Sequence, residues 1–250
     1  MSQDVILQIR NLKVYTPNGK LLIDSIDMDI HEGEVAVLFG PNGAGKSSLL
    51  SAIMGIGGYR VEGTIRFYGQ DITGLSPDHR AKLGIGLAYQ KPPSFKGLKV
   101  GELLKILAKM YQFPERELDE LVETLDMKDM LDRDVNRGFS GGESKRLEIL
   151  ALAIQRPKLA LIDEPDSGVD LEAISKIASA LKRVFQKHLK LKERKTGGIV
   201  ITHTGLILEH LHADTGYILI NRKVICSANP MEIFETIRKY GYSKCVTCCS

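Results

Sequence analysis

A glycine-rich segment near residue 40 combines the residue types that bind phosphate. Residues 40–47 read Gly-Pro-Asn-Gly-Ala-Gly-Lys-Ser, which fits the pattern GxxxxGK[ST]. In this pattern the loop N–H groups surround phosphate oxygens at a helix start, where the helix dipole also favours negative charge. Lys46 can reach the β and γ phosphates, and the Ser47 hydroxyl can bind Mg²⁺. The nucleotide-binding residues predicted here are Gly40, Pro41, Asn42, Gly43, Ala44, Gly45, Lys46, Ser47 and Ser48.

The flanking residues supply the structural context that this pattern needs. An apolar run at 35–39 predicts a buried strand, and residues 46–50 predict the start of a helix. The alternative is a glycine turn that matches by chance, but a chance match would not require a strand before it and a helix after it. The segment therefore predicts a site for a nucleoside triphosphate.

Two adjacent carboxylates follow a second apolar run. Residues 158–164 read Lys-Leu-Ala-Leu-Ile-Asp-Glu, so a buried strand delivers Asp163 and Glu164 to its carboxyl end, where open α/β sheets bind ligands. Side chains alternate along a strand, so we expect these two to point differently. Asp163 is predicted to hold Mg²⁺ through its water shell, and Glu164 to orient or deprotonate the attacking water. The alternative is an acidic helix start.

A third segment, Ser140-Gly141-Gly142-Glu143, precedes an apolar run. Ser-x-x-Glu is a capping box, which begins a helix. Capping alone does not explain the two glycines, because glycine in the first turn weakens a helix. They are consistent with a phosphate that approaches the backbone at this helix N-terminus.

Composition limits the class of protein. The 250 residues are 43% hydrophobic and 26% charged, as in an ordinary globular chain, and the net charge of +3 gives no reason to expect nucleic acid. No stretch approaches the roughly 18 uninterrupted apolar residues of a membrane span. The opening residues 1–4 lack a cationic start and an apolar core, so we expect no secretory signal and a cytoplasmic location.

The periodicity of apolar residues predicts an α/β fold. Strands are expected at 5–15, 21–30, 35–39, 63–69, 84–89, 159–162 and 198–201, and helices at 98–111, 115–127 and 141–155. Strands that alternate with helices indicate a parallel sheet. The three helices fall together, so we expect an all-helical insert between about residues 91 and 156.

The chain resembles the ATP-binding-cassette (ABC) ATPases, whose signature is the Ser140-Gly141-Gly142 segment. The motifs occur in the order of that family over nearly the whole chain. Gln90 matches the glutamine at the junction with the helical lobe, Asp170 the D-loop within residues 167–170, His203 the switch histidine, and Tyr15 the aromatic residue against adenine.

The resemblance implies a P-loop ABC ATPase fold in one domain over 1–250. It has a RecA-like parallel-sheet core, an antiparallel β subdomain and an inserted α-helical subdomain. The catalytic α/β lobe covers about 1–90 and 157–250, and the helical signature lobe about 91–156.

The resemblance also implies a head-to-tail homodimer that forms with ATP and hydrolyses it with Mg²⁺. Each ATP would lie between the phosphate loop of one chain and the signature of the other. Lys46, Glu164 and His203 are the implied catalytic residues. Ser47, Gln90 and Asp163 are the implied Mg²⁺ ligands, and Ser140, Gly141, Gly142 and Glu143 form the implied trans signature.

Finer resemblances concern the partner. Residues 135–146, Val-Asn-Arg-Gly-Phe-Ser-Gly-Gly-Glu-Ser-Lys-Arg, and 166–170, Asp-Ser-Gly-Val-Asp, resemble SufC, the ATPase family of the Suf iron–sulfur cluster assembly system. That resemblance implies Suf scaffold subunits of the SufB/SufD type as partners. The alternative is the ATPase of a membrane transporter, because residues 69–77 also resemble amino-acid importers. A third alternative is an ATP-gated scaffold with little turnover.

Cysteines gather at the end of the chain. Cys245, Cys248 and Cys249 lie in the last six residues, and Cys226 lies in an expected strand. Four cysteines suggest no disulfide framework, and we expect reduced thiols in a cytosolic ATPase. The tail is either a plain flexible end or a transient iron or cluster ligand, since Cys-x-x-Cys spacing can place two thiolates on one metal.

Overall fold

Two β-sheets and a set of covering helices make up residues 4–243, the part of the chain that the computed structural model describes. The strands are β1 Val5–Tyr15, β2 Leu21–His31, β3 Val35–Phe39, β4 Arg60–Phe67, β5 Gln70–Asp71, β6 Ile85–Ala88, β7 Leu159–Asp163, β8 Gly197–Ile201, β9 Thr215–Ile220 and β10 Lys223–Ala228. The α-helices are α1 Lys46–Met54, α2 Pro77–Leu83, α3 Val100–Met110, α4 Glu115–Thr124, α5 Gly141–Gln155, α6 Leu171–Val184, α7 Leu206–Leu211 and α8 Pro230–Tyr240. Two short 3₁₀ helices are η1 Lys128–Met130 and η2 Leu191–Glu193.

The larger sheet forms the centre of the molecule. Its strand order is β10-β9-β3-β8-β7-β6, with parallel pairing throughout except for β10, which runs antiparallel to β9. Every residue of β3, β7 and β8 is buried. These strands have helices or the second sheet on both faces, which explains why they read as continuous apolar runs rather than as alternating ones.

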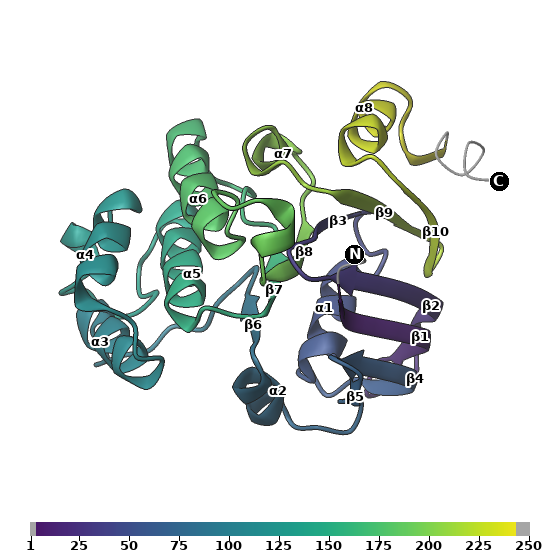
Figure 1. Cartoon of the computed structure of the whole chain (residues 1–250), viewed down its shortest axis with the longest axis horizontal. Coiled ribbons are helices and arrows are strands. Elements are labelled where there is room, and N and C mark those ends of the chain that lie inside the picture. Colours follow the sequence, from purple (N-terminus) through teal and green to yellow (C-terminus); the bar gives the residue numbers. More distant parts are fainter. Residues whose placement is uncertain (1–3, 244–250) are drawn as a thin grey trace.

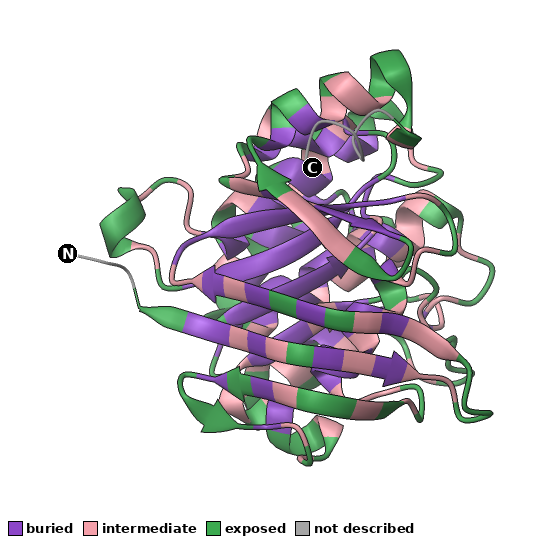
Figure 2. Cartoon of the chain, turned by 90° about the vertical axis from the view of Figure 1, so that its right-hand side faces the viewer, coloured by how far each residue is buried: buried purple, intermediate pink, exposed green. Residues whose placement is uncertain are grey.

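The smaller sheet, β2-β1-β4-β5, is antiparallel. Buried and more exposed residues alternate along its strands, so one face packs on the core and the other meets solvent (Figure 2). Ile9, Ile26 and Ile65 belong to the core that this sheet shares with α1. The sheet and α3–α4 lie at opposite ends of the long axis (Figure 1).

The chain between β6 and β7 is helical, as expected, and carries α3, α4, η1 and α5. The expected helix over 115–127 ends earlier, at Thr124, because Asp126 adopts a left-handed backbone with φ 53°. The expected strand over 63–69 begins earlier, at Arg60, where it pairs with Tyr15 of β1. None of the helices within residues 4–243 is long and apolar enough to cross a lipid bilayer.

Candidate nucleotide site

The phosphate loop joins the buried end of β3 to the first turn of α1. Gly45, the residue before α1, has φ 105°, a left-handed conformation that side chains other than glycine rarely adopt. At Gly40, a β-carbon would lie 2.4 Å from the carbonyl oxygen of Leu219 on β9. The backbone conformation therefore requires glycine at position 45, and close packing against β9 requires glycine at position 40.

Lys46 lies beneath this loop and is only 5% exposed. Its Nζ donates hydrogen bonds to the carbonyl oxygens of Gly40 at 2.8 Å and Pro41 at 3.0 Å. Burial lowers the pKa of Lys46, while the carboxylates of Glu164 and Asp163 act in the opposite direction. The ammonium group is thus held inside the loop, beside the carboxyl end of β7.

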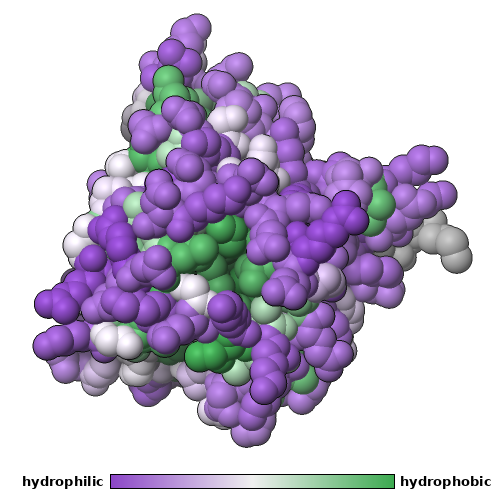
Figure 3. All heavy atoms as spheres, turned by 90° about the vertical axis from the view of Figure 1, so that its left-hand side faces the viewer, coloured by the Kyte–Doolittle hydropathy of each residue, from purple (hydrophilic) through white to green (hydrophobic). Residues whose placement is uncertain are grey.

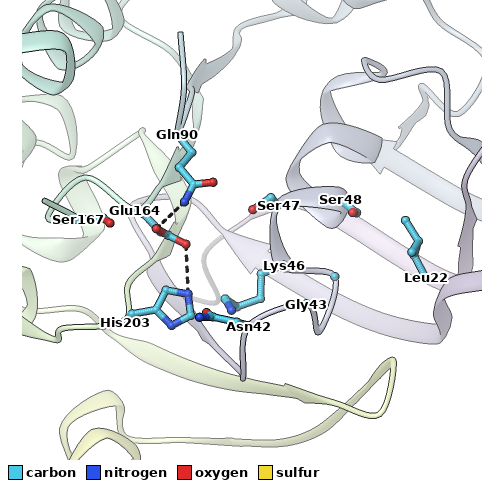
Figure 4. Close-up of a pocket in the computed structure, with 11 residues that line it drawn as sticks. Leu22, Asn42, Gly43, Lys46, Ser47, Ser48, Gln90, Glu164, Ser167 and His203 are labelled. Atoms are coloured by element: carbon cyan, nitrogen blue, oxygen red, sulfur yellow. Dashed lines mark hydrogen bonds and ion pairs between the residues drawn. The ribbon is translucent and has the colours of Figure 1, made fainter. Parts of the chain in front are cut away.

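A cavity of about 650 Å³ opens in front of the loop (Figure 4). It brings together residues that the sequence placed in five separate segments. Its lining residues are Leu22, Asn42, Gly43, Gly45, Lys46, Ser47, Ser48, Gln90, Glu164, Ser167 and His203. Leu22 was not predicted, because a β-strand leucine carries no sequence signal for ligand contact. Among the predicted nucleotide residues, Tyr15, Gly40, Pro41 and Ala44 do not line this cavity.

Side chains that follow the carboxyl ends of β6, β7 and β8 meet at the carboxylate of Glu164. Its carboxylate accepts a hydrogen bond from Gln90 Nε2 at 2.6 Å, and its other oxygen lies 3.1 Å from His203 Nε2 (Figure 4). Strand register explains the convergence, since Ala88 of β6 pairs with Ile162, and Asp163 pairs with Ile201 of β8.

The backbone of Glu164 is left-handed, with φ 51°. For a residue other than glycine this conformation costs roughly 1–2 kcal/mol. The N–H of Glu164 donates to the carbonyl oxygen of Ile201 at 3.0 Å, which helps to hold the conformation. Strain at a residue that turns its carboxylate into a cavity is typical of functional sites.

Asp163 is the last residue of β7, whereas Glu164 follows the strand with a left-handed backbone, so the chain bends between the two carboxylates. It is 7% exposed, and its Oδ1 has no hydrogen-bond partner among the described residues. Burial raises the pKa of Asp163, and a hydrogen bond from Ser47 opposes that increase. A buried carboxylate oxygen beside a serine hydroxyl fits the oxygen ligands that Mg²⁺ prefers.

No group of three or more His, Cys, Asp or Glu side chains is placed to hold a metal ion within residues 4–243. This agrees with the usual binding of Mg²⁺ at phosphate sites, where one or two protein ligands act together with phosphate and water.

The signature segment begins α5 with the predicted capping box. The Ser140 hydroxyl accepts a hydrogen bond from the Glu143 N–H at 3.2 Å, and Glu143 Oε2 accepts one from the Ser140 N–H at 2.6 Å. Ser140, Gly141, Gly142 and Glu143 line a second cavity of about 280 Å³ together with Asp170. Within one chain, these signature residues do not line the cavity that holds Lys46.

Tyr15 lies outside the main cavity. The guanidinium carbon of Arg60 lies 4.1 Å from the centre of its ring, and its hydroxyl donates to Glu62 at 3.2 Å. Arg60 therefore covers part of the ring that was expected to stack on adenine.

Lys145, a buried residue beside this site, was not predicted from the sequence. It is 5% exposed, and its Nζ donates to the carbonyl oxygens of Tyr89 at 3.1 Å and Asp163 at 2.9 Å. Burial lowers the pKa of Lys145, and the nearby carboxylates, Asp163 first, oppose that effect. Helical periodicity could have revealed it, because Lys145 shares the buried face of α5 with Ile149 and Leu152.

The three cysteines of the expected metal-binding tail, Cys245, Cys248 and Cys249, lie outside the described residues. Cys226 on β10 is disulfide-bonded, which differs from the expected reduced thiols. The number of cysteines does not decide pairing, because a disulfide depends on the distance between two thiols in the folded chain.

Comparisons with known proteins identify the family. A family model described as ABC transporter matches residues 23–167. An uncharacterized ABC transporter ATP-binding protein of Methanocaldococcus jannaschii is 37% identical over 243 residues, which covers 94% of this chain and 93% of that protein. A probable ATP-dependent transporter of Antithamnion sp. is 33% identical over 255 residues, which covers 97% of this chain and 98% of that protein.

Solved structures agree on the fold. The ATP-binding subunit of an ABC transporter superposes with a TM-score of 0.76 at 22% identity, covering 98% of this chain and 99% of that one. A nucleotide-free ATP-binding cassette from an ABC transporter gives 0.73 at 24% identity, covering 94% and 96%. The predicted fold class is thereby confirmed, and the chain belongs to the ABC ATPase family, whose domains bind ATP with Mg²⁺ and hydrolyse it.

Proposed function

We propose that this chain is the ATP-hydrolysing subunit of a larger complex and that two copies close head to tail around ATP. The observation that carries the proposal is the separation of two half-sites within one chain. Lys46, Glu164 and His203 line one cavity, whereas Ser140 and Gly141 line others. A twofold axis between two copies would bring each signature over the partner's phosphate loop and form two equal sites.

The exposed N-terminus of α5 suits the trans role proposed for the signature. Ser140 and Gly141 are exposed, and the absence of side chains at Gly141 and Gly142 lets a phosphate approach the backbone. Glu143 acts indirectly in this proposal, because its carboxylate is already hydrogen-bonded within the capping box.

In the proposed reaction, Glu164 accepts the proton of the attacking water, and ATP and water become ADP and phosphate. His203 and Gln90 contact its two carboxylate oxygens, at 3.1 and 2.6 Å, and so position it. The contact with His203 Nε2 requires that this nitrogen carry a proton. Lys46 neutralises the β and γ phosphates, because its ammonium group lies directly beneath the loop.

Ser47 and Asp163 are the residues proposed to hold Mg²⁺, with Gln90 as a further oxygen ligand. When bound, the ion would neutralise charge on the β and γ phosphates. In the described structure the Gln90 amide nitrogen faces Glu164. Its amide oxygen thus remains available for the ion.

The test compares two substitutions in the cavity. Glu164→Gln should keep ATP binding, lower kcat by about 100-fold or more because it removes the base, and accumulate an ATP-bound dimer in size-exclusion chromatography. Lys46→Ala should lose ATP binding and therefore the dimer, because it removes the phosphate counter-charge. Glu209→Gln, on the exposed face of α7, is the matched control and should behave as wild type. Wild-type hydrolysis by Glu164→Gln would contradict the assignment of the base.

We favour the membrane subunits of an ABC transporter as the partner, because similar proteins carry transporter names. The helical lobe offers surface for such a contact. Its exposed apolar side chains include Phe95, Ile106 and Met110, and an apolar hollow is visible among hydrophilic side chains on this side of the molecule (Figure 3). A cleft of about 360 Å³ beside Gln90 and Phe139 would connect a partner there to the nucleotide site.

A Suf-type scaffold of the SufB/SufD class is the second candidate, supported by the sequence of the signature and of residues 166–170 rather than by the names of relatives. In these two segments the chain departs from the transporter pattern, with Glu143 in place of glutamine and Asp166 in place of threonine. Both candidates require the same ATPase cycle. They differ in whether the partner is an integral membrane protein.

A further inference from the structure

We propose that Asp166 is a positioning residue for ATP hydrolysis, because its carboxylate holds the loop that carries His203. The inference rests on the role proposed above for His203. Asp166 lies three residues after Asp163, the carboxylate proposed to hold Mg²⁺, and does not line the nucleotide cavity, so we expect it to act without touching the phosphates.

The contacts of Asp166 lie on both sides of His203. Its Oδ2 accepts a hydrogen bond from the Thr202 hydroxyl at 2.6 Å and another from the Thr204 hydroxyl. Asp166 is 2% exposed and Thr202 is 1% exposed, so little water competes for the first contact. The two neighbours of His203 are thus attached to one carboxylate oxygen.

Both hydroxyls also receive hydrogen bonds from the start of α7. The Gly205 N–H donates to Thr202 Oγ1 at 3.1 Å, and the Leu206 N–H donates to Thr204 Oγ1 at 3.3 Å. A hydroxyl has a single proton, which each threonine gives to Asp166, so each must act as acceptor toward the backbone N–H. The result is two chains of hydrogen bonds, each of which runs from a backbone N–H at the start of α7 through a threonine hydroxyl to Asp166.

These two hydrogen-bond chains determine where His203 lies. The loop between β8 and α7 has its backbone fixed before and after the histidine, and the imidazole then points at Glu164, 3.1 Å away (Figure 4). Loss of the carboxylate would leave the loop free to adopt other conformations, and the His203–Glu164 contact would be populated for less of the time.

Asp166 also belongs to a segment that reaches the surface proposed for dimer contact. Ser167 lines the nucleotide cavity, and Gly168 to Asp170 line the cavity that contains the signature. The same short segment thus touches the histidine loop at one end and the signature at the other. A change at the dimer surface would be transmitted to His203 through Asp166.

The test is a double-mutant cycle on the full chain, with kcat and KM for ATP measured by phosphate release. Asp166→Ala should lower kcat about 10-fold or more, with KM within about twofold, because the ATP-binding groups are untouched. His203→Ala should lower kcat at least as far. The double variant should be no slower than His203→Ala, because Asp166 acts through that side chain.

A second pair of variants tests the hydrogen bond without removing the buried carboxylate. Thr204→Val should lower kcat with little change in KM, and Thr204→Ser, which keeps the hydroxyl, should recover most of that loss. Thr236→Val on α8 removes a hydroxyl that donates to the Glu232 carbonyl oxygen of the same helix, not to Asp166, and should leave kcat unchanged. This pair decides the question if Asp166→Ala does not fold.

The outcomes separate the two levels of the proposal. Full activity of His203→Ala would overturn the role of His203 and this inference with it. If His203→Ala is impaired, the inference is overturned by wild-type kcat in Asp166→Ala, by losses that multiply in the double variant, or by equal kcat in Thr204→Val and Thr204→Ser.

Discussion

Asp163 and Glu164 are adjacent in sequence, yet their surroundings differ completely. Asp163 ends a buried strand, and burial raises its pKa. Glu164 turns into the cavity through a left-handed backbone and contacts two polar side chains. A metal ligand must lie beside the phosphate loop, whereas a base must face the water that it activates. Because the chain bends between Asp163 and Glu164, one of these neighbouring carboxylates can serve as the metal ligand and the other as the base.

A carboxylate of the signature makes a pH-dependent contribution to stability. The hydrogen bond from the Ser140 N–H, aided by Arg133, lowers the pKa of Glu143 below its usual value of 4.5. The ionised form is therefore more stable in the folded chain. Its contribution is present above pH 4.5 and is lost as the pH falls through the lowered pKa. Glu143→Ala should lower the free energy of unfolding by about 1 kcal/mol at pH 7, the usual net contribution of one hydrogen bond.

Urea unfolding at a series of pH values measures this difference. The difference in free energy of unfolding between wild type and Glu143→Ala should become smaller as the pH falls below 4.5, since the wild-type carboxylate becomes protonated. Glu235→Ala, on the exposed face of α8, is the control and should show no such trend. A difference in free energy of unfolding that stays constant or increases in acid would show that the carboxylate contacts do not stabilise the helix start.

At the scale of elements, the spacing between β7 and β8 decides where the site residues meet. Gly198 on β8 lies so close to β7 that a β-carbon there would be 2.3 Å from the Ala160 carbonyl oxygen and 2.6 Å from the Phe185 ring. Neither neighbour can move easily, because one is backbone and the other is a fully buried side chain. The strand that leads to His203 therefore requires glycine at this position.

Gly198→Ala should destabilise the fold by about 3 kcal/mol through overpacking. It should also lower kcat, because β8 would shift relative to β7 and separate His203 from Glu164. Gly74→Ala is the matched control, since a β-carbon there meets no atom within 4 Å. Denaturant unfolding and phosphate release on the same samples check both effects. A variant as stable and active as Gly74→Ala would show that the strands can separate without cost.

For the whole molecule, the nucleotide site and the exposed apolar side chains of the helical lobe lie on different parts of the surface. The helical lobe extends to the end of the molecule opposite the antiparallel sheet (Figure 1). Such an arrangement allows a partner to bind the lobe while a second ABC domain binds ATP. A motion of the lobe on ATP closure would then act on the partner.

Capture of the native partner tests this arrangement. Tagged chain should recover integral membrane subunits from a detergent extract if it serves a transporter, and a soluble scaffold subunit without detergent if it serves a Suf-type system. Ile106→Asp with Met110→Asp should abolish either capture and leave basal hydrolysis intact, because both side chains are exposed and neither lines the nucleotide cavity. Met231→Asp, on α8, is the control. Undiminished capture by the double variant would place the partner elsewhere.

The sequence by itself determined the features that depend on neighbouring residues. The phosphate loop, the carboxylates after β7 and the capping box at Ser140 are each contained within a few consecutive positions, so local backbone geometry is enough to predict them. The strands β3, β7 and β8 were equally clear, because full burial requires continuous apolar runs.

Only the tertiary structure decided which distant residues meet. Gln90 and Glu164 are hydrogen-bonded although 74 positions apart, and Asp166 and Thr202 although 36 apart. Those contacts follow from the register and packing of β6, β7 and β8, which no local pattern encodes. Lys145 is different: helical periodicity places it on the buried face of α5, but its contact with the Asp163 carbonyl oxygen depends on how α5 packs against the end of β7.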